Sequence, residues 1–85
     1  MIQPDITLNL IIEILKQNTN IINNISASPN IENYIRSDIY KGLCKIENIL
    51  LTFLYQIVPI YPELENQVGD NLKIVYHNRV HFPWN

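Results

Sequence analysis

The stretch that decides the fold is residues 29–57, PNIENYIRSDIYKGLCKIENILLTFLYQI. Ser28 before Pro29 is typical of a helix start, because serine caps free backbone N–H groups and proline fits the first helical position. Pro59 has no backbone donor, so we expect the helix to end at about Ile57. At about 1.5 Å per residue this helix is a rod of roughly 40 Å, which is long for a chain of 85 residues.

This long helix carries two apolar stripes. The main stripe has helical spacing and consists of Ile31, Ile35, Ile39, Ile46, Ile49, Leu50, Phe53 and Ile57. A second, weaker stripe follows spacings of four, seven and four and consists of Tyr40, Cys44, Leu51 and Tyr55. A helix with two apolar faces packs between two layers. Because the rest of the chain offers only about three other helical segments, we expect another subunit to cover the second stripe, and its four residues are the candidate interface.

Three further helices complete the prediction. Residues 5–25 follow a cap at Asp5 and form an amphipathic helix. Its predicted apolar face consists of Ile6, Leu10, Ile11, Ile14, Leu15, Ile21, Ile22 and Ile25. A short helix over residues 62–68 ends at Gly69, and a last helix covers residues 70–81. We therefore predict one all-α domain over residues 1–85, a small antiparallel bundle of three to four helices that dimerises through the long helix.

A strand is the alternative for residues 72–82, because Ile74, Val75 and Tyr76 favour a sheet. A hairpin there would turn at residues 77–78, which lack the Asn-Gly type of turn signal. Helix is the preferred prediction.

Composition excludes several classes of protein. Hydrophobic residues make up 47% of the chain and charged residues 16%, which is too apolar for intrinsic disorder. A formal net charge of -2 argues against a polybasic nucleic-acid binder. The lone Cys44 forms no internal disulfide and has no CxxC partner for zinc, which favours a reducing, cytoplasmic location without metal or cofactor. The longest apolar run, residues 49–61, falls short of the roughly 20 residues of a membrane span.

The dense polar cluster lies at residues 77–81, HNRVH, and holds both histidines of the chain. In a helix His77 and His81 lie one turn apart, but no nearby Asp, Glu or Cys completes a metal site. Two imidazoles and a guanidinium also suit RNA cleavage, in which one imidazole takes the 2′-hydroxyl proton and Arg79 steadies the phosphate. The candidate catalytic residues are therefore His77, Arg79 and His81. The simpler alternative is a polar C-terminal turn with ordinary surface side chains.

Residues 61–81, YPELENQVGDNLKIVYHNRVH, resemble the C-terminal part of HepT-like HEPN proteins. Members often have a Pro-Glu-Leu helix, an Asp-led helix with an Ile-Ile-type pair, an Arg-Asn dipeptide and a nearby His. The resemblance implies an all-α bundle that dimerises with ribonuclease clefts at the interface. It also implies a toxin paired with a minimal nucleotidyltransferase antitoxin, and metal-independent cleavage by an Arg and a His separated by four to six residues.

The chain departs from this pattern at the catalytic positions. Aligned on Asn78, the Arg position of the family holds His77. The usual His falls on Phe82 or, with a one-residue gap, on His81. Arg79 lies only two residues before His81, which is too close for the family spacing. The scaffold of the family therefore carries over and its catalytic pair does not, so we expect a weakened or inactive version.

Three functional hypotheses follow. The preferred one is a degenerate HepT-like HEPN protein that acts as a dimerising protein-interaction subunit, related to toxin–antitoxin or defence systems. Its partner is a second copy or another protein, such as a minimal nucleotidyltransferase antitoxin. The first alternative is an active metal-independent ribonuclease, for which RNA is the substrate. The second alternative is a stand-alone inhibitor or accessory subunit of a larger complex.

Overall fold

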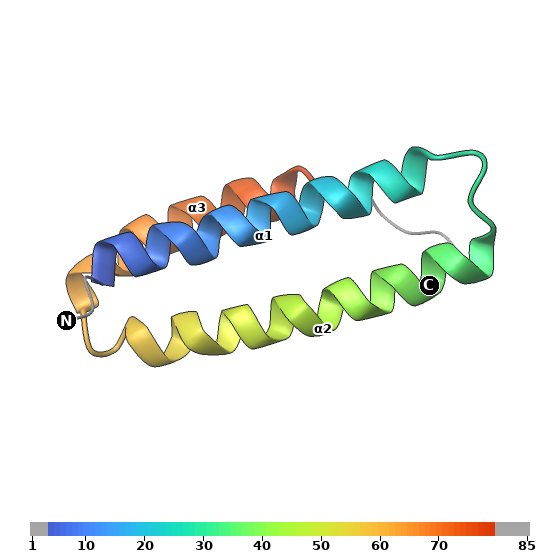
Figure 1. Cartoon of the computed structure of the whole chain (residues 1–85). Coiled ribbons are helices and arrows are strands. Elements are labelled where there is room, and N and C mark those ends of the chain that lie inside the picture. Colours follow the sequence, from blue (N-terminus) through green and yellow to red (C-terminus); the bar gives the residue numbers. More distant parts are fainter. Residues whose placement is uncertain (1–3, 80–85) are drawn as a thin grey trace.

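A computed structural model describes residues 4–79, which are almost entirely helical (Figure 1). Helix α1 spans Pro4–Ala27, α2 spans Asn33–Ile57 and α3 spans Glu65–His77, and the short 3-10 helix η1 covers Pro62–Leu64. The described residues contain no strand. The prediction of an all-α helical bundle is therefore confirmed, and α3 occupies residues 72–77 of the alternative strand.

Helices α1 and α2 are antiparallel rods of similar length, and α3 runs along α1 on one side of this pair (Figure 1). A hydrogen bond from Asn18 Nδ2 to the Leu43 carbonyl, 3.2 Å long, joins the middle of α1 to α2. The Asn9 side chain accepts a hydrogen bond from Gln67 of α3, and Asn23 donates one to the Asn78 carbonyl. The result is an elongated molecule with extents of 44 × 21 × 18 Å.

The long helix begins later than predicted. Ser28 does not cap it: the Ser28 hydroxyl donates to the Asn24 carbonyl, so it satisfies an acceptor at the end of α1. Arg36 then donates hydrogen bonds to the Ser26 and Ser28 carbonyls, which holds the connection against the first turn of α2. Helix α2 therefore starts at Asn33, four residues after Pro29, and it ends at Ile57 as predicted.

The two predicted C-terminal helices, 62–68 and 70–81, are wrong as separate elements. The chain forms η1 and then one continuous α3 that passes through Gly69, which has no positive φ. Glycine weakens a helix interior by about 1 kcal/mol, but Val68 and Val75 on either side of Gly69 are buried and offset that cost. Residues 80 and 81 of the predicted helix lie outside the described residues.

The core follows a regular spacing of three and four residues on α1 and α2. On α1 these inward positions are Leu8, Ile11, Leu15, Asn18, Ile22 and Ile25. On α2 they are Tyr40, Leu43, Glu47, Leu50, Leu54 and Ile57. Such spacing keeps one seam of each helix in contact with its neighbour over a long antiparallel pair. Val68 and Val75 of α3 close the larger of two apolar clusters.

The predicted apolar faces are only partly the buried ones. Ile6, Leu10, Ile14 and Ile21 of α1 were expected inside but are exposed, whereas Leu8 and Ile12, absent from the predicted face, are buried. On α2 most of the predicted main stripe is also exposed, namely Ile35, Ile39, Ile46, Ile49 and Phe53. Both helices have more aliphatic residues than α3 and each other can cover, so each helix also exposes a second apolar side.

Candidate functional site

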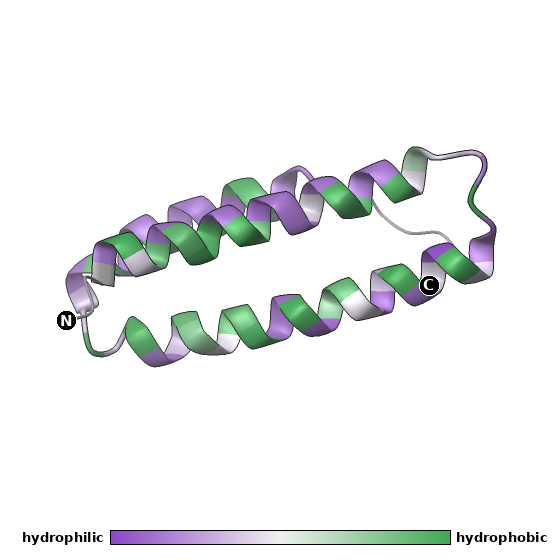
Figure 2. Ribbon diagram, in the orientation of Figure 1, coloured by the Kyte–Doolittle hydropathy of each residue, from purple (hydrophilic) through white to green (hydrophobic). Residues whose placement is uncertain are grey.

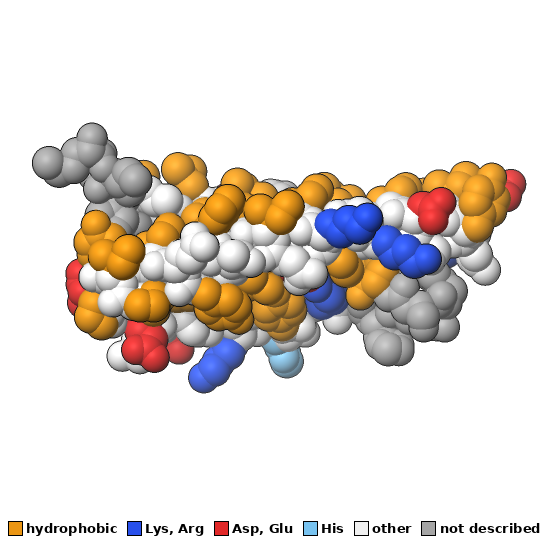
Figure 3. All heavy atoms as spheres, turned by 90° about the horizontal axis from the view of Figure 1, so that it is seen from below, with side chains coloured by type: hydrophobic (Ala, Val, Ile, Leu, Met, Phe, Trp, Pro, Cys, Tyr) orange, Lys and Arg blue, Asp and Glu red, His pale blue; other side chains and the backbone are white. Residues whose placement is uncertain are grey.

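The exposed aliphatic residues of α1 and α2 form one surface, which we call the open face. Its members are Ile6, Leu10, Ile14 and Ile21 of α1, and Ile35, Ile39, Ile46, Ile49 and Phe53 of α2. At about 100° per residue these positions point away from those that contact α3 on both helices, so the open face lies on the opposite side of the α1–α2 layer. Hydrophobic ribbon segments face the viewer on both helices in Figure 2, and hydrophobic side chains line the upper edge of Figure 3.

The open face is large for a protein of this size. Together its nine residues expose the equivalent of about four fully exposed large apolar side chains, on the order of 750 Å². The largest apolar patch of a typical soluble monomer covers about 300–600 Å². On a helical wheel no Lys or Arg lies between these positions, although the exposed Gln17 does, and interface centres are likewise depleted of charge. These properties are those of a protein-contact surface.

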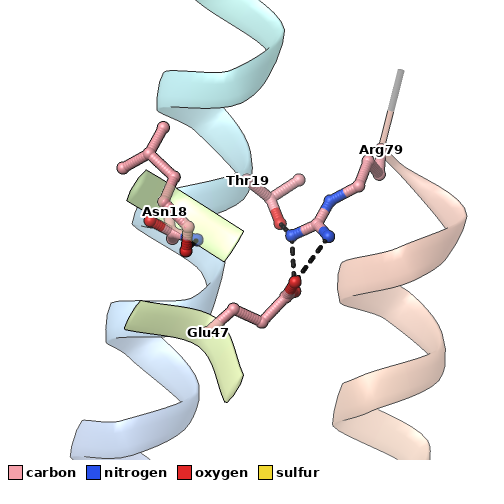
Figure 4. Close-up of polar contacts among 5 residues, drawn as sticks. Asn18, Thr19, Glu47 and Arg79 are labelled. Atoms are coloured by element: carbon pink, nitrogen blue, oxygen red, sulfur yellow. Dashed lines mark hydrogen bonds and ion pairs between the residues drawn. The ribbon is translucent and has the colours of Figure 1, made fainter. Parts of the chain in front are cut away.

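A buried polar layer lies on the other side of the α1–α2 pair, where α3 packs (Figure 4). Arg79, just after α3, donates from Nη1 to Glu47 Oε2 at 2.9 Å, and its Nη2 lies 2.6 Å from Glu47 Oε1. Nη2 also donates to the Thr19 hydroxyl at 3.0 Å. The side chains of Arg79 and Glu47 are only 15% and 8% exposed. The guanidinium therefore makes a two-pronged ion pair inside the bundle and links all three helices.

The surroundings keep Arg79 charged and the neighbouring Tyr76 neutral. Burial alone lowers the pKa of Arg79, but the hydrogen bond and the charge of Glu47 outweigh it and hold the pKa above its ordinary value. For Tyr76, burial first and then the hydrogen bond and charge of Glu47 raise the pKa above the usual range. The Arg79 guanidinium also lies 5.0 Å from the centre of the Tyr76 ring, a cation–π contact.

The predicted catalytic residues do not meet in an open cleft within the described chain. His77 is the last residue of α3, is exposed, and lines an open hollow with Lys73, Ile74 and Asn78. Arg79 points between the helices toward Glu47 and Thr19, as Figure 4 shows. His81 lies outside the described residues. The catalytic role of the three residues stays a prediction, but the charge that was to steady a phosphate is already paired within the chain.

The predicted interface residues lie mostly against the chain's own helices. Tyr40 packs on Ile22 and Ile25 of α1, and Leu51 packs against the larger core cluster. Cys44 is half-buried, whereas Tyr55 is 68% exposed. Cys44 lies close enough to Arg79, and Tyr55 close enough to Tyr76, for a weak electrostatic interaction, so Cys44 and Tyr55 lie near the end of α3. The role of this stripe between chains stays a prediction, and the larger uncovered surface is the open face.

Sequence reasoning missed the polar layer, although a signal for it was present. Asn18 interrupts the inward seam of α1 and Glu47 that of α2, each at a position where the three-and-four spacing demands an apolar residue. Such interruptions indicate a buried polar group that needs a partner. The partner of Glu47 was not readable from Glu47 alone, because Arg79 lies 32 residues away, although it continues the inward spacing of Val68, Leu72 and Val75.

Comparison of the chain with protein-family models, curated proteins and solved structures gives no match. The resemblance to HepT-like HEPN proteins therefore stays a prediction. Over residues 4–79, none of the helices combines the length and the apolar character needed to cross a membrane. The same part of the chain contains no group of three or more His, Cys, Asp or Glu side chains placed to hold a metal ion.

Proposed function

We propose that this protein is a helical interaction subunit that forms a homodimer through its open face and has lost the ability to cleave RNA. The observation that carries the proposal is the size and composition of the open face. An area on the order of 750 Å² is close to the about 800 Å² that each partner contributes to a stable interface. Covering it removes from water a surface that a small domain exposes at a large free-energy cost.

The state of Arg79 supports the second half of the proposal. A phosphate could reach this guanidinium only after the paired charges of Glu47 and Arg79 had separated, which would leave the Glu47 carboxylate buried without a counter-ion. A substrate-binding arginine is ordinarily free to meet the anion. The arrangement suits a structural arginine in a degenerate HepT-like HEPN scaffold. A cytoplasmic toxin–antitoxin or defence role, with or without a nucleotidyltransferase partner, is part of the same proposal.

Sedimentation velocity from about 0.1 to 100 µM tests the dimer. We expect the wild type to form dimers and Ile46→Lys, on the open face, to remain monomeric with unchanged helical circular dichroism. The matched control is Ile74→Lys on α3, because Ile74 is exposed to a similar degree, 54% against 47%. It should dimerise like the wild type. A wild type that stays monomeric at 100 µM would refute the proposed function.

Incubation of the purified protein with RNA and EDTA tests the loss of catalysis. We expect no cleavage above that of a His77→Ala, His81→Ala double variant. Cleavage that persists in chelator and disappears in the double variant would establish the ribonuclease alternative instead.

A further inference from the structure

We draw no further inference here: the strongest candidate, the apolar open face on α1 and α2, belongs to the site already described, and nothing in the described part of the chain shows what covers it.

Discussion

The two sides of the α1–α2 pair differ in a way that hydrophobicity alone does not suggest. The side that α3 covers contains Asn18, Thr19 and Glu47 at buried positions. The nine residues that define the open face opposite are eight aliphatic side chains and Phe53. A large apolar surface is thus left uncovered in the monomer. The covered side therefore suits one specific neighbour, the helix α3, whereas the open face suits close contact with another apolar surface.

The polar layer explains why α3 takes its place on the covered side. A buried carboxylate and the nearby hydroxyl of Thr19 accept an arginine at one position only, so Arg79 fixes how far α3 extends along the pair. Aliphatic side chains form no hydrogen bonds that could fix the position of a neighbouring helix in this way. On the open face the register must come from shape.

The largest expected effect comes from truncating a buried residue on the covered side, compared with truncating an exposed residue on the open face. Leu54 is 0% exposed between α1 and α3, so Leu54→Ala should lower the free energy of unfolding by about 3 kcal/mol through lost burial and a cavity. Ile49→Ala, at 56% exposure on the open face, should cost less than about 1 kcal/mol in dilute, monomeric protein. Urea unfolding at about 0.1 µM measures both values. Equal costs there would mean that the two sides do not differ in burial.

The next largest effect on the free energy of unfolding comes from removing the polar layer. Arg79→Met leaves the Glu47 carboxylate buried without its counter-ion and should lower the free energy of unfolding by about 3 kcal/mol or slightly less. A second substitution, Glu47→Leu, removes the stranded charge and should restore most of that loss. The double-mutant cycle is measured by urea unfolding. Losses that simply add would show that the two side chains do not depend on each other.

The smallest effect concerns pH. The pKa of Tyr76 is raised in the folded state, so its neutral hydroxyl contributes stability fully below about pH 10, the pKa of an unfolded tyrosine. That contribution is lost as the pH rises from there toward the folded pKa. The free energy of unfolding of the wild type should fall more steeply between about pH 10 and 11 than that of Tyr76→Phe. Parallel curves for the two proteins would contradict the role assigned to Tyr76.

The sequence predicts the fold class well and the buried sides poorly, for physical reasons. Residues 33–57 contain no proline and have helical spacing throughout, which leaves few alternatives to a long helix. Periodicity cannot say which of two apolar stripes is inside when both helices carry two, because the choice depends on where α3 packs. That position depends on Arg79 and Glu47, which lie far apart in the chain. Gly69 was predicted to end a helix because glycine is common at helix ends. The local preference of a glycine does not show whether buried valines on either side keep it within a helix, as they do in α3.

Intermolecular contacts measured by isotope-filtered NMR, on a mixture of labelled and unlabelled chains, test the central claim most directly. If the open face joins two copies, methyl groups of its isoleucines, such as Ile39, Ile46 and Ile49, should show nuclear Overhauser effects between the two chains. Intermolecular effects that involve Ile74 of α3 instead, or none from the open face in concentrated protein, would contradict it.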